Sequence, residues 1–312
     1  MRAAEKIIGR FAPTPTKFLH AGNIFCALIS YLAAKSKGGK FLIRIEDLDK
    51  ARCPDVSAKE TLAALEFLGI VSDEEPIYQS RRTEAYERAL DILSKRASLY
   101  PCFCTRAQLH AAEAPRLSDG VVVYDGACRN LSREEIARRT LERKPCLRVC
   151  VPDRTVNFRD GILGGYSQNL ASSCGDFIVR RSDGVFAYQL AVVVDDGECG
   201  VTQVVRGSDL LSSTPRQIWL QRLLGYARPE YYHIPLMCDA DGRKLGKSEG
   251  DDARRLFDRF TPNEILGGLA FAAGLLPELR TASLDELVRT FDFDKIRRDK
   301  IFLPEQFSYD LQ

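Results

Sequence analysis

One stretch near the N-terminus, residues 7–23, constrains the fold more than any other part of the chain: Ile-Ile-Gly-Arg-Phe-Ala-Pro-Thr-Pro-Thr-Lys-Phe-Leu-His-Ala-Gly-Asn. Its pattern predicts a short buried strand over Ile7–Ala12, a rigid loop over Pro13–Leu19 and a helix that runs to about Lys37. The prolines restrict the loop backbone and lack the N–H groups that would pair it with a sheet. The stretch therefore predicts a fixed turn from a strand into a helix.

The beginning of this expected helix suits a phosphate group. Backbone N–H groups in a first helical turn are unpaired, and the helix dipole is positive there. His20 adds a donor, and Gly22 lets a flat ring or a phosphate approach the backbone closely. A buried histidine at a strand-to-helix turn would give the same local pattern, so this stretch alone leaves both interpretations open.

The segments that follow continue an α/β pattern. Lys40–Ile45 alternates like a strand, and strand, helix, strand is the opening of a parallel sheet with nucleotide-binding topology. Further strands are expected at Leu147–Val151, Val156–Phe158, Val201–Arg206 and Tyr232–Met237, with apolar segments at Phe177–Val179 and Phe186–Val194. Helices are expected from a capping box at Ser57–Glu60, over Arg82–Arg96 and Ser132–Arg143, from a capping box at Thr214–Gln217 to Gly225, and from Thr261 and Ser283. We therefore expect a Rossmann-type parallel sheet.

The middle of the chain has a different composition and holds a cysteine cluster, Cys102-Phe-Cys104 followed by Cys128. A Cys-x-Cys pair can bind tetrahedral Zn²⁺ from one side, with Cys128 and a fourth ligand from the other. His110 lies between the two groups and is a candidate for that fourth ligand. Buried free thiols are the alternative to a metal site.

A second motif near the other end of the chain carries two lysines in a turn, Lys244-Leu-Gly-Lys247-Ser. With His20-Ala-Gly22-Asn23 it resembles the pair of signature motifs, HIGH and KMSKS, of class I aminoacyl-tRNA synthetases. The resemblance implies that His20, Asn23, Lys244 and Lys247 are catalytic and that His20, Gly22 and Lys247 contact ATP, with Mg²⁺ bridging the phosphates. Gly246 and Ser248 depart from the usual loop, which affects its mobility and its affinity for phosphate.

Within this family the chain resembles the glutamate branch. Gly9-Arg-Phe-Ala-Pro-Thr-Pro15 is similar to the glutamyl signature, Arg44-Ile-Glu-Asp47 to the segment whose glutamate meets the substrate ammonium, and the segments around Tyr188 and Arg206 to the remaining substrate positions. A guanidinium group at a strand end suits a carboxylate, so Arg10 is expected to bind the acidic side chain. An Arg10–Glu46 ion pair with no substrate role is the alternative. The residues that the resemblance assigns to glutamate are Arg10, Phe11, Ala12, Pro13, Thr14, Glu46, Tyr188 and Arg206.

Over essentially its whole length the chain resembles a truncated paralogue group of this branch that activates L-glutamate and transfers it to queuosine in the anticodon wobble position of tRNA(Asp). That resemblance implies that Tyr124 is a zinc ligand beside Cys102, Cys104 and Cys128. We expect a first catalytic half over residues 1–100, a zinc-containing insertion over 101–176, a second half over 177–249 and a helical stub over 250–312 without an anticodon-binding domain. The alternatives are a minimal glutamyl-tRNA synthetase that charges the 3′ end, and an inactive tRNA-binding module.

Composition is compatible with this interpretation. The net charge of +2 neither requires nor excludes a nucleic-acid partner. An arginine cluster in the insertion is typical either of a solvated helix face or of an RNA contact, and comprises Arg129, Arg133, Arg138, Arg139 and Arg143. No signal-peptide or membrane-spanning pattern is present, so we expect a cytoplasmic monomer with reduced thiols.

Overall fold

The computed structural model describes residues 6–16, 18–105, 107–108, 123–239, 242–245 and 253–307. At its centre is a seven-stranded sheet in the order β3-β2-β1-β9-β10-β6-β7. All neighbouring strands are parallel except β6 and β7, which form an antiparallel hairpin. The strands are β1 (Ile8–Phe11), β2 (Lys40–Ile45), β3 (Ile77–Tyr78), β6 (Thr155–Asp160), β7 (Gly164–Asn169), β9 (Gln203–Gly207) and β10 (Glu230–Ile234). The predicted α/β class with a parallel sheet is confirmed.

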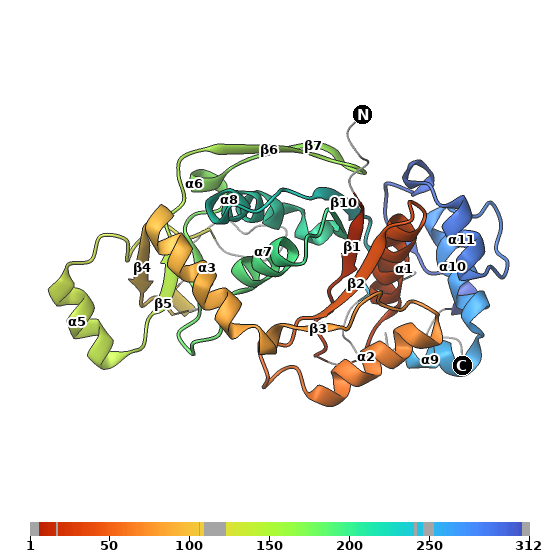
Figure 1. Ribbon diagram of the computed structural model, residues 1–312, viewed down its shortest axis with the longest axis horizontal. Coiled ribbons are helices and arrows are strands. Elements are labelled where there is room, and N and C mark those ends of the chain that lie inside the picture. The colour runs from red at the N-terminus through yellow and green to blue at the C-terminus, as the bar shows by residue number, and fades with distance from the viewer. Residues whose placement is uncertain are drawn as a thin grey trace.

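Helices cover both faces of this sheet (Figure 1). Successive strand residues point to opposite faces, so Val205 packs into one hydrophobic core and Val204 into the other. The first core lies under α1 (Ala21–Lys35), α2 (Asp55–Phe67), α9 (Arg254–Arg259), α10 (Pro262–Ala273) and α11 (Leu284–Thr290). The second lies under α3 (Thr83–Arg96), α7 (Tyr188–Glu198) and α8 (Thr214–Leu224).

A smaller antiparallel sheet of three strands lies at one end of the molecule, opposite α10 and α11 (Figure 1). It comprises β4 (Leu99–Cys102), β5 (Cys146–Val149) and β8 (Phe177–Arg180), with α5 (Arg133–Glu142) beyond it. The β6–β7 hairpin falls inside residues 101–176 but joins the main sheet beside β10. The domain boundaries expected from the sequence stay a prediction.

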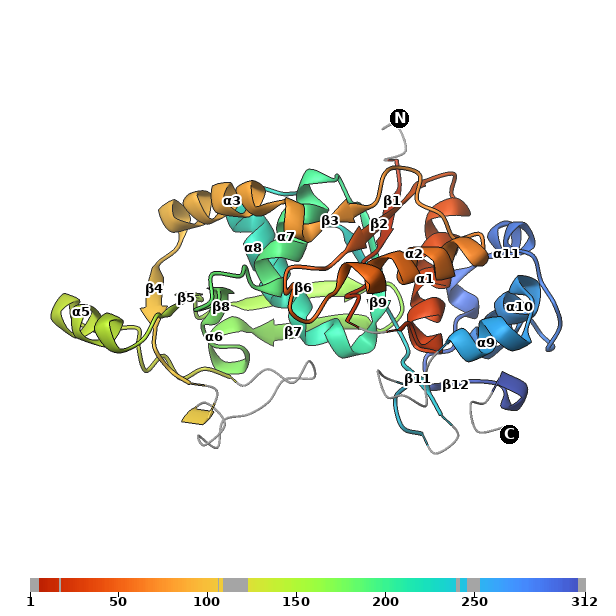
Figure 2. The same cartoon turned by 90° about the horizontal axis from the view of Figure 1, so that it is seen from below.

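Short elements complete the connections. The chain forms α6 (Leu170–Ser173), a parallel pair of β11 (Met237–Cys238) and β12 (Ile301–Phe302), and the 3₁₀ turns η1 (Gln79–Arg81), η2 (Ser208–Ser213), η4 (Phe293–Lys295) and η5 (Glu305–Phe307). Figure 2 shows β11 and β12 side by side beneath α1 and α9. The part of the chain after residue 252 is therefore not purely helical, because Ile301 and Phe302 pair with β11.

Two local predictions are wrong for identifiable reasons. Helix α2 begins at Asp55, after the extended Pro54, so Ser57 is already buried in the first turn and cannot cap it. The 3₁₀ turn η2 runs directly into α8, so Thr214 lies inside the helix and its hydroxyl is used elsewhere. The apolar segment 186–194, for which no element type was predicted, is mostly the buried helix α7.

None of the helices in the described part of the chain combines the length and the apolar character needed to cross a membrane.

Candidate active site

A cavity of about 430 Å³ lies at the carboxyl ends of the central strands. In a parallel sheet these ends meet along one edge, where ligands usually bind. Of the residues predicted for glutamate, ATP or catalysis, the following line this cavity: Arg10, Phe11, Ala12, Pro13, Thr14, His20, Gly22, Asn23, Glu46, Tyr188, Arg206 and Lys244. Lys247, Gly246 and Ser248 lie outside the described residues.

Strand register explains why distant side chains meet here. Phe11, the last residue of β1, pairs with Ile43, so β2 runs two residues further, to Ile45, and Glu46 follows it directly. The N–H of Glu46 donates to the carbonyl of Pro13 at 2.9 Å, which attaches the proline-containing loop to the end of β2. The loop and the strand ends are therefore one rigid wall.

His20 stands at the N-cap of α1, not inside its first turn. The backbone N–H of His20 donates to the side-chain oxygen of Asn23 at 3.1 Å, so Asn23 holds the start of the helix in addition to lining the cavity. A Cβ atom on Gly22 would lie 3.0 Å from Nδ1 and 3.1 Å from Cε1 of His20. Glycine at this position therefore leaves room for the His20 ring as well as for a ligand.

The lysine-containing segment reaches the same cavity from the far end of the sequence. Leu245 is buried, and its N–H donates to the carbonyl of Met237 at 2.9 Å. Lys244 forms an ion pair with Asp209, another residue of the cavity wall. The segment 242–245 is thus attached beside β11, with the Lys244 ammonium group beside the cavity that His20 lines.

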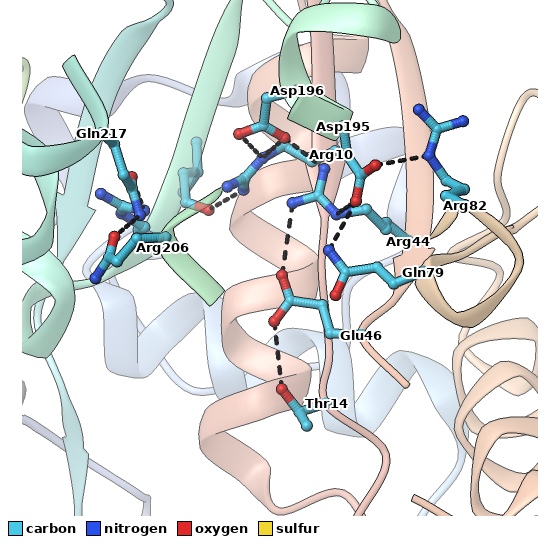
Figure 3. A network of polar contacts seen from close by, with 12 residues as sticks. Arg10, Thr14, Arg44, Glu46, Gln79, Arg82, Asp195, Asp196, Arg206 and Gln217 are labelled. Atoms are coloured by element: carbon cyan, nitrogen blue, oxygen red, sulfur yellow. Dashed lines mark hydrogen bonds and ion pairs between the residues drawn. The ribbon is translucent and has the colours of Figure 1, made fainter. Parts of the chain in front are cut away.

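Behind the cavity lies a buried network of arginines and carboxylates (Figure 3). Nε of Arg10 donates to Asp196 at 3.2 Å, and Arg44 pairs with the same carboxylate. Arg44 also lies 3.5 Å from Glu46, whose other oxygen accepts a hydrogen bond from Thr14 at 3.3 Å. A direct Arg10–Glu46 pair, the alternative left open by the sequence, is not the arrangement among the described residues.

The adjacent Asp195 anchors the network to α3. It accepts hydrogen bonds from Gln79 at 2.7 Å, from Arg82 at 2.6 Å and from the hydroxyl of Tyr86 at 2.9 Å. Two successive carboxylates on α7 therefore fix three arginines, and each of these five charges has a partner of opposite sign.

Burial and charge shift the pKa of these carboxyl groups in opposite directions. Burial raises the pKa of Asp196, but Arg10 and Arg44 outweigh it and hold that pKa below its usual range. Burial raises the pKa of Glu46, and its more distant partner Arg44 does not reverse the shift. Glu46 is the less compensated carboxylate, and a substrate ammonium would favour its charged form.

Tyr188 opens α7 and lies against the cavity, and burial raises the pKa of its hydroxyl. Arg206 approaches from β9 and donates to three uncharged acceptors, Thr214, Gln217 and His233. Figure 3 shows the Arg206–Gln217 contact. The site thus combines donors for phosphate, cations for carboxylates and one carboxylate for an ammonium group.

The cysteine cluster lies at the small sheet. The Sγ atoms of Cys102, Cys104 and Cys128 all lie within 4.8 Å of one another. The Tyr124 hydroxyl oxygen lies 3.5 Å from Sγ of Cys102 and 3.8 Å from Sγ of Cys104, and it accepts the N–H of Cys128 at 2.7 Å. The four residues predicted as ligands therefore meet. His110, the rival, lies outside the described residues.

These separations fit a tetrahedral metal ion. Ligand atoms about 2.3 Å from a tetrahedral Zn²⁺ lie about 3.8 Å from one another. The Cys104–Cys128 sulfur separation is 3.6 Å, and the tyrosine–sulfur separations are close to the same value. A hydrogen bond from Cys146 lowers the pKa of Cys102 below its usual range. The donor set can hold Zn²⁺.

Three members of the arginine cluster already have carboxylate partners. Arg138 pairs with Glu135 and Glu142, Arg139 pairs with Glu135, and Arg129 pairs with Asp176. Their charge is partly neutralised within the chain, as on a solvated helix face.

The sequence interpretation missed the residues that hold the site together. Asp195 and Asp196 directly follow the apolar segment 186–194 and were assigned no role, although two carboxylates in an otherwise buried helix signal buried cationic partners. Asp160 and His233 gave no local signal, because they are 73 positions apart and meet only through the pairing of β6 with β10.

Comparison with known proteins places these features in context. The catalytic-domain pattern of the family "tRNA synthetases class I (E and Q)" matches residues 6–256. Glutamyl-Q tRNA(Asp) synthetase of Neisseria meningitidis serogroup C (strain 053442) is 45% identical over 95% of this chain and 99% of its own. Its counterpart from Symbiobacterium thermophilum is 42% identical over 96% of this chain and 97% of its own.

Solved structures agree with these sequence relatives. The glutamate-tRNA synthetase from Elizabethkingia anophelis has a TM-score of 0.81 at 27% identity, covering 97% of this chain and 69% of that one. A glutamate tRNA ligase from Elizabethkingia meningosepticum, determined in complex with its amino acid, has the same TM-score and identity and is covered over 68%. The two structural relatives are longer than the matched region.

Proposed function

The chain belongs to the class I tRNA synthetases of the glutamate and glutamine group, with glutamyl-Q tRNA(Asp) synthetases among its relatives, and we propose that it activates L-glutamate with ATP and transfers it to queuosine in the anticodon wobble position of tRNA(Asp). The observation that carries the proposal is that one and the same cavity is lined by groups suited to an amino acid and by groups suited to a triphosphate. The identity of the tRNA acceptor rests on the relatives' names.

In the first step an oxygen of the glutamate α-carboxylate attacks the α-phosphorus of ATP, and the bond to the β-phosphate oxygen breaks as pyrophosphate leaves. As in class I synthetases generally, Mg²⁺ accompanies ATP and neutralises part of its charge. His20, the N-terminus of α1 and Lys244 are placed to stabilise charge on the phosphates, and we assign Lys247 to the same task. No proton transfer by the protein is required.

The substrate contacts follow from the charges on the cavity wall. Arg10 and Arg206 bind the side-chain carboxylate, Glu46 and Thr14 lie beside the ammonium, and Tyr188 closes the amino-acid end. Gly22 leaves space for the nucleotide, while Phe11, Ala12 and Pro13 shape the wall between the two substrates. In the second step a hydroxyl of the queuosine cyclopentenediol attacks the activated carbonyl, an ester forms and AMP leaves.

Zn²⁺ at Cys102, Cys104, Tyr124 and Cys128 would act structurally, because these residues do not line the cavity. The ion would bring β4 and the segment around Cys128 together beside the catalytic sheet. We also propose that the protein is a monomer and that it acts in the cytoplasm, where ATP and tRNA are available.

The acceptor distinguishes this function from its rival, a minimal glutamyl-tRNA synthetase. The enzyme is incubated with ATP, Mg²⁺, labelled glutamate and one of four RNAs: tRNA(Asp) with queuosine, the same tRNA without its 3′-terminal adenosine, tRNA(Asp) lacking queuosine, and tRNA(Glu). We expect equal labelling of the first two and none of the third or the fourth. Label that depends on the 3′ adenosine, or that appears on tRNA(Glu), would contradict the proposal.

A further inference from the structure

Among the residues that the structure describes, Arg206 is a buried cation without a carboxylate partner. Its side chain is 4% exposed and lines the cavity. Three of its N–H groups donate to uncharged acceptors: Oγ1 of Thr214 at 2.7 Å, Oε1 of Gln217 at 2.8 Å and Nε2 of His233 at 3.0 Å. Within the described ranges, no carboxylate lies at ion-pair distance from Arg206, whereas Arg10 and Arg44 are both paired with Asp196.

Strand register places His233 between Arg206 and a carboxylate. Arg206 and His233 are direct partners in β9 and β10, and Tyr231 of β10 pairs with Asp160 of β6. Nδ1 of His233 lies 2.6 Å from Asp160. Asp160 also accepts the backbone N–H groups of Ile162 at 3.0 Å and Leu163 at 2.9 Å, so it is a fully bonded acceptor.

This arrangement fixes the tautomer of His233. An ionised carboxylate has no hydrogen to give, so Nδ1 donates to Asp160 and Nε2 is left to accept from Arg206. Burial lowers the pKa of His233 to about 4 in spite of Asp160, so the ring is neutral near pH 7. The imidazole therefore holds the guanidinium without cancelling its charge.

The other side of Arg206 is fixed by amides rather than by acids. Nε2 of Gln217 donates to Oε1 of Gln189 at 3.0 Å, and Nε2 of Gln189 donates to Oγ of Ser213 at 2.9 Å. These two hydrogen bonds turn the carbonyl end of the Gln217 side chain toward Arg206. Thr214 and Gln217 lie three positions apart on α8, so both face the guanidinium from the same side of that helix.

We propose that Asp160 and His233 are positioning residues that set the amino-acid specificity of the site, by fixing Arg206 through a neutral ring so that its charge remains available to a side-chain carboxylate. The inference deepens the proposed function and rests on it. A buried charge lacking a partner is costly, and the glutamate side chain relieves that cost on binding. Glutamine has the same shape but no charge, so it leaves Arg206 uncompensated.

The sharpest test neutralises Arg206 without changing the shape of the site. Gln217→Glu puts a carboxylate at the position of the present amide, so the substrate carboxylate would meet a like charge. ATP–pyrophosphate exchange then gives kcat/KM for glutamate and for glutamine. We expect the glutamate value to fall on the order of 100-fold and the glutamine value to change little. An equal fall for both amino acids would overturn the proposal.

Gln221→Glu is the matched control. Gln221 is a buried amide on the same helix, and it donates to the Tyr231 hydroxyl at 2.8 Å rather than contacting Arg206. It receives the same chemical change one turn further along α8. We expect the ratio of glutamate to glutamine activity to stay within about 3-fold of wild type. A similar loss of selectivity here would show that any added charge on α8 is sufficient.

A second pair of variants tests positioning directly and decides the matter if Gln217→Glu fails to fold. His233→Leu removes the acceptor for Arg206, and His233→Gln retains one. We expect His233→Leu to raise the KM for glutamate about 10-fold or more with the KM for ATP nearly unchanged, and His233→Gln to recover most of that loss. Equal changes in both KM values, or no recovery, would indicate only a structural role.

Failure of the proposed function gives a different result. If wild type catalyses exchange with glutamate but labels no tRNA(Asp), the transfer step is wrong and the specificity test still applies. If wild type shows no exchange, calorimetric titration with glutamate and glutamine replaces it. Equal affinity of wild type for the two amino acids would then end the inference.

Discussion

At the scale of single residues, the phosphate end of the cavity depends on how closely His20 and Gly22 approach. His20 caps α1, and Asn23 holds its backbone. The ring lies so close to Cα of Gly22 that any Cβ there would press on two of its atoms. The glycine was expected to admit a ligand, and its first neighbour proves to be the catalytic candidate itself.

Gly22→Ala should therefore separate activity from stability. The methyl group displaces the His20 ring, and loss of one donor to developing phosphate charge costs about 3 kcal/mol, or about 100-fold in kcat for pyrophosphate exchange. The helix gains up to about 1 kcal/mol because alanine replaces glycine in its first turn. Exchange kinetics and thermal unfolding measure the two effects.

His20→Ala provides the control for this prediction. If the alanine at position 22 acts through the His20 ring, it should cause almost no further loss of activity in a chain that already carries His20→Ala. Additive losses would mean that Gly22 contacts the nucleotide directly, and that the clash with His20 is not the cause.

At the scale of elements, the small sheet and the cysteine cluster form one unit. The Arg148 guanidinium lies over the Tyr124 ring, with Cζ of Arg148 3.8 Å from the ring centre. The Tyr124 hydroxyl oxygen approaches the sulfur atoms of Cys102 and Cys104. Residue type and spacing indicated His110 as the fourth ligand, whereas the family resemblance implied Tyr124. Among the described residues, Tyr124 places its oxygen beside two of the sulfur atoms, as a fourth ligand would.

Tyr124→Phe should weaken zinc binding by at least about 10-fold, since it removes one ligand atom and keeps the ring. Zinc content after dialysis against a competing chelator is the measurement. Tyr100→Phe is the matched control: that hydroxyl donates to Asp176 in the same region, and within the described ranges it has no hydrogen bond to a sulfur atom. Full zinc retention by Tyr124→Phe would show that the tyrosine is not a ligand.

At the scale of the whole molecule, the sequence predicted those helices and strands that neighbouring residues alone determine. The strand and helix at residues 8–35 were predicted because apolar periodicity, prolines and the helix start agree there. The N-terminal starts of α2 and α8 were misplaced because a capping box is a four-residue pattern, and tertiary packing decided whether Ser57 and Thr214 were available to cap.

The candidate site divides in the same way. Arg10, Glu46, Tyr188 and Arg206 were predicted by motif and converge on one cavity. Their partners could not be predicted, because Asp196 lies 186 positions from Arg10 and His233 lies 27 from Arg206, and only strand order and register bring these pairs together. A motif identifies the group that faces the substrate. The fold determines which buried partners surround that group and how far they compensate its charge.

The most direct test of the account is a crystal structure with a sulfamoyl analogue of glutamyl-adenylate. The account predicts the sulfamoyl group within about 3.2 Å of His20 or Lys244, the side-chain carboxylate at Arg10 and Arg206, and the ammonium at Glu46. An analogue bound outside this cavity, or with its carboxylate turned away from Arg206, would contradict it.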